Sequence, residues 1–283
     1  MIDSHPVSDK QEKLGEIIRQ LGSVIVAYSG GVDSSLLAWH ARKILKEQAK
    51  IVIAVSPSLA QADLLAARKQ AEQFGWNLIE IQTAEVTRPQ YQQNDGRRCY
   101  YCKQTLFEAL QQMATRLNIA HIAYGANVDD LSDFRPGHKA AQEYKVVSPL
   151  QQAGLAKDEI RLLAHQAGLS SWSKPQSPCL SSRFPTFEIV TVEKLAQVEK
   201  AEDYLHRLGF KQVRVRHHGD LARIEVEVTE LGQLTANSVL MQNVSCHFKE
   251  LGFRYVALDM DGYFQGSANR LKSIVEVTEV TKD

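Results

Sequence analysis

The sequence lacks three features that would place a protein in a broad class at first sight. Its 283 residues contain no uncharged apolar run of about 18 residues, the length that a helix needs to cross a bilayer. The first residues hold no apolar stretch typical of a secretion signal. Acidic and basic residues balance at 33 each, which counts against a nucleic-acid partner. We therefore expect a cytoplasmic protein without a membrane partner.

Cysteine is scarce too, and two common nucleotide-binding motifs are missing. Four cysteines in a cytosolic chain argue against a disulfide scaffold and favour metal or sulfur chemistry. Neither the lysine-containing loop GxxxxGK[ST] nor the loop GxGxxG occurs in the chain. A nucleotide site in this protein therefore needs another kind of phosphate-binding loop.

One stretch has the properties of such a loop. Residues 24–27 are an apolar run typical of a buried strand, and residues 35–45 have the apolar spacing of a helix. The N–H groups of the loop between them converge, and the helix dipole adds about half a positive charge there. Two glycines allow close approach of an anion, and three serines add hydroxyl donors. The residues expected to form this nucleotide site are Ser29, Gly30, Gly31, Asp33, Ser34 and Ser35.

The loop sequence SGGVDS resembles the PP-loop of the ATP pyrophosphatases. Members of that superfamily bind ATP, release pyrophosphate and leave AMP on a substrate. The alternative is an ordinary glycine-rich turn between a strand and a helix. The position of the match, between a predicted strand and a predicted helix, favours an ATP site.

Strands and helices alternate through the first part of the chain. Four apolar runs predict strands at 24–27, 51–55, 78–81 and 121–124. Helical spacing occurs at 10–22, 35–45, 61–74 and 103–117. This alternation predicts an α/β fold with a doubly wound, mostly parallel sheet, which binds ligands at the carboxyl ends of its strands. Ser56 and Gly125 lie at such ends and are expected to contact ATP, whereas the polar residues 83–97 are expected to form a loop reaching out of the core.

A Pro- and Ser-rich segment at 172–188 marks a change of composition and a domain boundary. We expect a PP-loop domain at residues 1–175 and a smaller α+β domain at 176–283, used for substrate binding or oligomerisation. In the second domain, alternating residues at 212–216 and 222–228 predict a hairpin. Helices are predicted at 192–208 and 231–251, and a last strand at 254–258.

Acidic residues follow the fourth predicted strand, close to the expected phosphates. They are Asp129, Asp130 and Asp133. Mg²⁺ prefers carboxylates together with phosphate oxygens and water, so Asp129 and Asp130 are candidate Mg²⁺ ligands. The alternative is an acidic loop that faces solvent and caps a helix.

Three cysteines are candidates for metal or sulfur chemistry. Cys99 and Cys102 form a CxxC motif, and Cys179 lies in the proline-rich segment. A CxxC motif can be a redox pair, half of a zinc site or part of an iron–sulfur site. Three thiolates can hold a cubane cluster with one iron open, provided that Cys179 folds back over the pair. For Cys179 the alternative is a linker thiol without a role, and for Cys246 we expect no role.

Basic residues flank these thiols and pair up on the predicted hairpin. Arg97, Arg98, Lys103 and Arg183 are expected to lower the pKa values of the thiols. On the hairpin, Arg214 and Arg216 share one sheet face and suit a phosphate or carboxylate. The alternatives are a carboxylate partner for Arg183 and a cross-strand Arg214–Glu225 salt bridge.

Seven motifs together resemble one family. They are SGGVDSS, RCYYCK, GANVDDLSDFRPG, SPL…GLAKDEIR, SPCLSSRFP, RVRHHGDLARIE and LDMDGYFQGSAN, in this order along the chain. This set is similar to the LarE family, ATP-dependent sulfur transferases that help to build the nickel-pincer nucleotide cofactor. The resemblance implies that a carboxylate of a pyridinium biscarboxylic acid mononucleotide is adenylated and that sulfur then displaces AMP, giving a thiocarboxylate.

The resemblance also implies roles for individual residues. Cys179 matches the position of the family's sulfur-donating cysteine, which in sacrificial members loses its own sulfur. Cys99 and Cys102 resemble the family's three-cysteine branch, in which the thiolates hold a 4Fe–4S cluster and sulfide comes from an external source. The resemblance implies that Arg183, Arg214 and Arg216 bind the substrate's phosphate or carboxylates, and that the protein forms homo-oligomers. The alternatives are a PP-loop tRNA thiolation enzyme and sacrificial use of Cys179.

Overall fold

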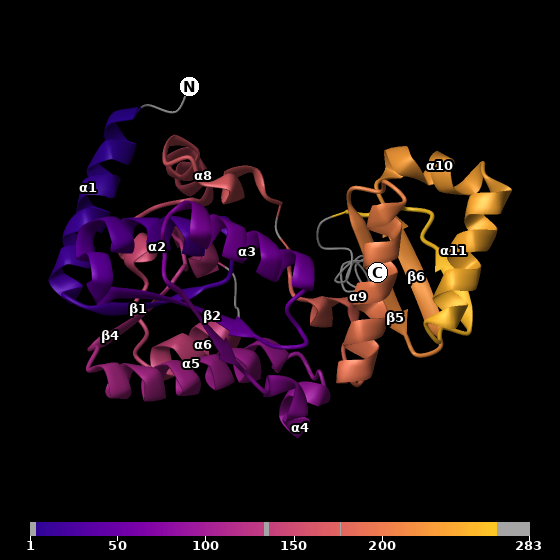
Figure 1. The fold of residues 1–283 in the computed structure, drawn as a ribbon, viewed down its shortest axis with the longest axis horizontal. Coiled ribbons are helices and arrows are strands. Elements are labelled where there is room, and N and C mark those ends of the chain that lie inside the picture. Colours follow the sequence, from indigo (N-terminus) through magenta and orange to yellow (C-terminus); the bar gives the residue numbers. More distant parts are fainter. Residues whose placement is uncertain (1–3, 133–135, 176, 265–283) are drawn as a thin grey trace, which may run out of the picture. The chain divides into compact units, whose positions relative to one another are not determined.

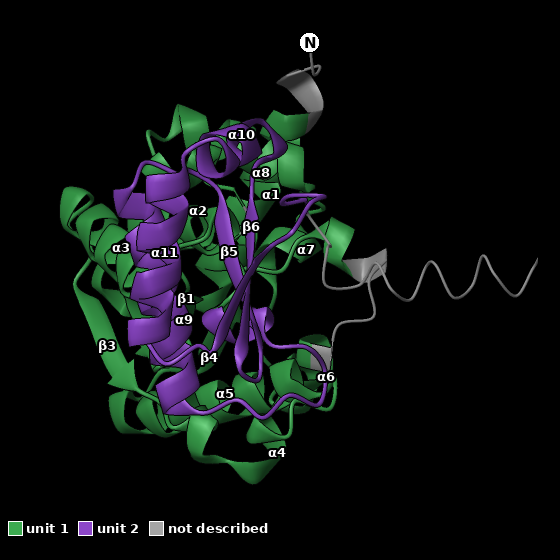
Figure 2. Ribbon diagram, turned by 90° about the vertical axis from the view of Figure 1, so that its right-hand side faces the viewer, with its two compact units in different colours: residues 1–179 green, residues 180–283 purple. Residues whose placement is uncertain are grey.

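The protein consists of two compact units, Met1–Cys179 and Leu180–Asp283, drawn in two colours in Figure 2. A computed structural model describes residues 4–132, 136–175 and 177–264. Asp133 therefore lies outside the described residues. Among those that are described, no helix has the length and apolar character needed to span a membrane.

The first unit alternates strands and helices, as the sequence predicts. Its strands are β1 (Val24–Tyr28), β2 (Ala49–Val55), β3 (Leu78–Gln82) and β4 (His121–Tyr124). Its helices are α1 (Ser4–Leu21), α2 (Val32–Leu45), α3 (Gln61–Gln73), α4 (Pro89–Gln92), α5 (Arg98–Leu117), α6 (Pro136–Glu143), α7 (Pro149–Gln152) and α8 (Lys157–Gln166). The strands pair in the order β3-β2-β1-β4, and every pair is parallel, so the predicted parallel α/β sheet is confirmed.

Strand order explains where a ligand can bind. The chain runs from β1 outward to β2 and β3, and then returns to place β4 on the other side of β1. The connections that leave β1 and β4 therefore diverge to opposite faces, which opens a crevice at the carboxyl ends of these two strands. The loop of residues 29–31 leaves β1 there, and Gly125 follows β4 at the same edge.

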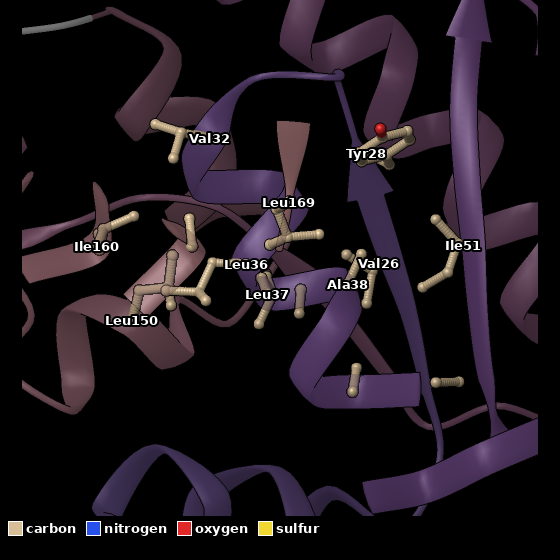
Figure 3. Packing of buried hydrophobic residues seen from close by; sticks show 14 of the residues in the cluster. Val26, Tyr28, Val32, Leu36, Leu37, Ala38, Ile51, Leu150, Ile160 and Leu169 are labelled. Carbon is tan, nitrogen blue, oxygen red and sulfur yellow. The ribbon is translucent and has the colours of Figure 1, made fainter. Parts of the chain in front are cut away.

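Apolar side chains cover both faces of the sheet. Helices α1, α2, α3 and α8 pack against one face, and α5 and α6 against the other (Figure 1). On the first face, Leu36 and Leu37 of α2 lie among residues of β1, α7 and α8 (Figure 3). Burial of each such side chain stabilises the fold by about 1.5–3 kcal/mol, so α2 and the loop before it are held firmly.

Two local expectations were wrong. Residues 83–97 do not reach out of the core, because Glu85, Val86 and Tyr91 are each no more than 2% exposed. The carboxylate of Glu85 accepts hydrogen bonds from Ser56 and Ser58 beyond the end of β2, which holds the segment against the sheet. Helix α5 also begins at Arg98 instead of residue 103, so both cysteines of the CxxC motif lie in its first turns.

The second unit contains a three-stranded sheet in the order β5-β6-β7. Its elements are α9 (Val192–Arg207), β5 (Val213–His218), β6 (Leu221–Val226), α10 (Leu231–Thr235), α11 (Ser238–Glu250) and β7 (Tyr255–Leu258). The predicted hairpin is confirmed, since β5 and β6 pair antiparallel. The single helix expected at 231–251 is wrong: Asn237 accepts a hydrogen bond from the N–H of Leu240 and starts α11 afresh.

One steric constraint fixes the crevice between β1 and β4. A Cβ atom at Gly125 would lie 2.7 Å from the backbone nitrogen of Ser34 and 2.9 Å from the carbonyl carbon of Asp33. Contacts this short do not occur with real Cβ atoms, and the backbone of a helix cannot move aside without loss of packing. Gly125 therefore permits the end of β4 to touch the first turn of α2.

Replacement Gly125→Ala is expected to lower the free energy of unfolding by about 2–3 kcal/mol, because the new methyl group overlaps with the α2 backbone. Gly15→Ala in α1 is the control, since its Cβ would meet only ordinary contacts of 3.5 and 3.6 Å. The control should be neutral or stabilising by up to about 1 kcal/mol. Urea unfolding followed by tryptophan fluorescence measures the first unit, which contains all of the chain's tryptophans, Trp39, Trp76 and Trp172. Equal stabilities of the two variants would contradict the steric argument.

Candidate active site

The loop after β1 is ordered by its own hydroxyl groups. The Ser34 hydroxyl donates to the carbonyl oxygen of Gly31 at 3.1 Å and accepts from the N–H of Ser29 at 3.1 Å. The Ser35 hydroxyl also donates to Gly31, at 2.8 Å. Gly30 has a φ of +74°, a conformation that favours glycine. The loop is thus preformed around the N-terminus of α2, whose first N–H groups have no partner within the helix.

A cavity of about 180 Å³ opens beside this loop. Four of the residues predicted to bind ATP line it, namely Ser29, Asp33, Ser34 and Gly125. Apolar side chains of β1, β2 and α5 complete the wall. The others do not line it: the Ser35 hydroxyl accepts a hydrogen bond from Gln70, and Ser56 donates to Glu85. We call this space the nucleotide cavity.

Asp33, in the first turn of α2, has partners that the sequence did not single out. The Asp33 carboxylate accepts from the Lys157 ammonium at 2.5 Å and from the Asn127 side-chain amide at 3.1 Å. Lys157 is the first residue of α8, in the motif GLAKDEIR, and its N–H donates to Asp129 at 2.7 Å. An acidic residue in the first turn of α2 thus meets a basic residue more than a hundred positions away, which spacing alone cannot reveal.

The three predicted cysteines come together in the fold. Cys99 and Cys102 of α5 and Cys179 at the end of the first unit line one cavity of about 390 Å³. The remaining walls carry charged and polar groups, among them Arg98, Lys103, Asp130 and His138. We call this space the thiol cavity. Cys246 lies on α11, in the second unit.

The expectation that nearby cations lower the thiol pKa values was wrong for Cys102. Burial raises the pKa of the Cys102 thiol to about 12, and the neighbouring Cys179 and Glu85 act in the same direction. Lys103 opposes this rise, but its effect is smaller than that of burial. Arg97 pairs with Asp95 on the surface, and Arg98 donates to Asn94 at 2.6 Å. Desolvation of the thiolate therefore outweighs the charges nearby.

The three thiols are ligands of the type that binds an iron–sulfur cluster, and they line one cavity together with cationic side chains. Within the described residues, however, no group of three or more histidine, cysteine, aspartate or glutamate side chains is close enough to hold a metal ion. Of the candidate Mg²⁺ ligands, Asp130 lines the thiol cavity and accepts from the N–H of Asn127 at 3.1 Å.

The two cavities share part of their walls. Lys103, Tyr124 and Gly125 line both of them. The Tyr124 hydroxyl lies 2.9 Å from Nδ1 of His138, which lines the thiol cavity. A molecule bound beside the loop after β1 would therefore have one end close to the thiols.

The predicted arginine cluster lies in the second unit. Arg183 and Glu202 form a bidentate ion pair of 2.9 Å, and both residues are buried. Arg216 forms a second bidentate pair with Glu225, which also accepts from Arg223. The alternative of an Arg214–Glu225 salt bridge is therefore wrong, although these two residues face each other in the register.

Arg214 differs from its neighbours. Burial, and next the charge of Arg183, lower the pKa of its guanidinium. It forms no ion pair with any described residue, and it stacks over the ring of Tyr263 at 5.2 Å. A buried guanidinium without a carboxylate partner is suited to accept an anion from outside the chain.

Comparisons with known proteins find one partial family match and three relatives that cover most of the chain. The family model described as NAD synthase matches residues 8–124. An uncharacterised protein of Synechocystis sp. is 43% identical over 94% of this chain and 98% of its own length. An uncharacterised protein of Methanocaldococcus jannaschii is 28% identical over 85% of this chain and 90% of its own length.

A third relative has a stated activity. The pyridinium-3,5-bisthiocarboxylic acid mononucleotide synthase of Lactiplantibacillus plantarum is 34% identical, over 93% of this chain and 95% of its own length. The match extends through both units, and so covers the nucleotide cavity, the three cysteines and the arginine cluster. The chain therefore belongs to the LarE family, to which this synthase belongs.

Proposed function

We propose that this protein is an ATP-dependent sulfur transferase that acts on pyridinium-3,5-biscarboxylic acid mononucleotide. ATP adenylates a carboxylate of this substrate with release of pyrophosphate, and sulfur then replaces AMP to give a thiocarboxylate. The observation that carries the proposal is the shared wall of the two cavities, since it brings a phosphate-binding loop and three thiols to one place. The relationship to the synthase of L. plantarum supports the choice of substrate.

Adenylation gives the substrate carboxylate a better leaving group. A free carboxylate is a poor electrophile, because displacement at its carbon would expel oxide, whereas the acyl-adenylate expels AMP. Pyrophosphate would lie against the loop of residues 29–31 and the N-terminus of α2, whose N–H groups and dipole stabilise negative charge. Mg²⁺ held by the phosphates and by Asp130 would neutralise the remaining negative charge of the pyrophosphate. Apolar residues of the nucleotide cavity, such as Ile53 and Leu59, would contact the adenine ring.

Sulfur delivery is assigned to the thiol cavity. Cys99, Cys102 and Cys179 would hold a 4Fe–4S cluster, which supplies an open iron able to carry sulfide from an external source. The protein's own part is to bring the three thiols to one cavity, and the raised pKa of Cys102 keeps the proton on that thiol until the site is occupied. The alternative route is loss of the Cys179 sulfur itself.

Substrate binding is assigned to the second unit. Glu202 and Glu225 hold Arg183 and Arg216 rigidly by two hydrogen bonds each. Arg214 has a guanidinium that no described carboxylate neutralises within 4.0 Å, and it would bind the phosphate or a carboxylate of the substrate. We also propose that this unit mediates homo-oligomer formation.

Incubation without oxygen with ATP, Mg²⁺, sulfide and pyridinium-3,5-biscarboxylic acid mononucleotide should yield AMP, pyrophosphate and a product with sulfur in place of one carboxylate oxygen. Cys179→Ser should lower product formation by at least about 100-fold, because the sulfur nucleophile is lost. Cys246→Ser is the matched control and should retain activity. Mass spectrometry measures both product and protein.

No turnover of the mononucleotide, together with tight, salt-dependent tRNA binding, would favour a tRNA thiolation enzyme. A fall of about 34 Da in protein mass would indicate the sacrificial route.

Protein purified without oxygen should be brown and contain about four irons per chain, because three thiolates can hold a cubane cluster. Each of the replacements Cys99→Ser, Cys102→Ser and Cys179→Ser should lower the iron content, while Cys246→Ser should not. Iron analysis and visible absorption provide the measurement. Colourless protein that stays iron-free after reconstitution would exclude the cluster.

In iron-free, reduced protein, Cys102 should react with iodoacetamide at pH 8 at least about 100-fold more slowly than Cys246, since only the thiolate reacts. A pKa of about 12 predicts that the rate at Cys102 rises about tenfold for each pH unit between pH 8 and 10. Peptide mapping of the alkylated protein measures the rates. Equal rates at pH 8 would show that the thiol is not desolvated.

A further inference from the structure

We propose that Lys103 binds the α-phosphate of the nucleotide while sulfur displaces AMP. The inference rests on the proposed function and adds a catalytic residue that links its two half-reactions. Lys103 directly follows the CxxC motif in α5, and it lines both the nucleotide cavity and the thiol cavity. Among the described residues it is the one cationic side chain that lines both cavities.

The ammonium group of Lys103 is available for a ligand. It lies 5.9 Å from the ring centre of Phe107 and 6.0 Å from that of Tyr124. It forms no ion pair with any residue in the described part of the chain, although Asp130 lines the same thiol cavity. Aromatic rings hold a cation in place without neutralising its charge, so the group is positioned and still able to bind an anion.

The other cations near the two cavities are engaged. Lys157 donates to the Asp33 carboxylate. Arg98 donates to Asn94, and it lines the thiol cavity but not the nucleotide cavity. Arg97 pairs with Asp95 and lines neither cavity. A phosphate that lies between the loop after β1 and the thiols would therefore meet Lys103 first.

The backbone leaves space for this lysine. A Cβ atom on Gly137 of α6 would lie 3.2 Å from Cγ of Lys103 and 3.8 Å from the carbonyl oxygen of Cys99. The lysine stem thus packs against a helix position without a side chain. A methyl group there would require the stem to shift by a few tenths of an ångström.

The chemical step creates negative charge at this point. The sulfur nucleophile forms a bond to the acyl carbon, and the bond between that carbon and the phosphate oxygen breaks. The electron pair of the broken bond stays on the oxygen of AMP. A lysine ammonium beside the α-phosphate stabilises this charge by electrostatic attraction. When hydrosulfide is the nucleophile, its proton passes to solvent.

The test uses Lys103→Met, which keeps the length of the stem and removes its charge, and Lys103→Arg, which keeps the charge. Lys139→Met, an exposed position on α6, is the control. Calorimetry with AMP as the probe should show binding about tenfold weaker in Lys103→Met, while Lys103→Arg and the control bind nearly as the wild type. In single-turnover experiments, sulfur transfer in Lys103→Met should fall by about 100-fold, and pyrophosphate release by much less.

Two results would overturn the proposal: unchanged AMP affinity in Lys103→Met, or equal losses of pyrophosphate release and sulfur transfer. Failure of the wild type to release pyrophosphate with the mononucleotide would instead disprove the proposed function, and AMP binding would still decide the role of Lys103.

The replacement Gly137→Ala provides a second measurement. It should weaken AMP binding in the wild type but not in Lys103→Met, because its effect acts through the lysine stem. Equal effects in both backgrounds would count against the proposal.

Discussion

The close contact between Gly125 and the first turn of α2 is the constraint on which the site depends. It lets β4 end directly against the helix whose N-terminus follows the phosphate-binding loop. Because β1 and β4 are neighbours and their connections diverge, this contact forms the floor of a crevice. The nucleotide cavity and the thiol cavity both include Gly125 in their walls. A single steric requirement thus joins the two halves of the proposed chemistry.

In each unit, ion pairs neutralise several of the charged side chains that the sequence singled out or the cavities include. Asp33 is balanced by Lys157, and Glu202 and Glu225 balance Arg183 and Arg216. Buried pairs of this kind cost desolvation energy and are retained where geometry matters more than stability. Lys103 in the first unit and Arg214 in the second each form no ion pair with a described carboxylate. These are the two positions where we propose that an anionic ligand binds.

Burial raises the pKa of one of the three thiols, that of Cys102. A surface CxxC motif flanked by basic residues would be expected to ionise readily, yet the first turns of α5 place Cys102 where desolvation dominates. A protonated thiol is a weak nucleophile and a weak ligand, so it remains inert until a metal displaces the proton.

Local patterns in the sequence determined the strands and helices of the first unit, the hairpin of the second, and the loop SGGVDS at a helix N-terminus. They did so because apolar periodicity and glycine placement are properties of neighbouring residues. The sequence failed where long-range contacts outweigh local polarity. Glu85 draws a polar segment into the core through Ser56 and Ser58, and Glu225 pairs with Arg216 instead of Arg214. Only the tertiary structure brought Cys179 to the CxxC pair and Lys103 to both cavities, because these placements depend on strand order and packing between distant segments.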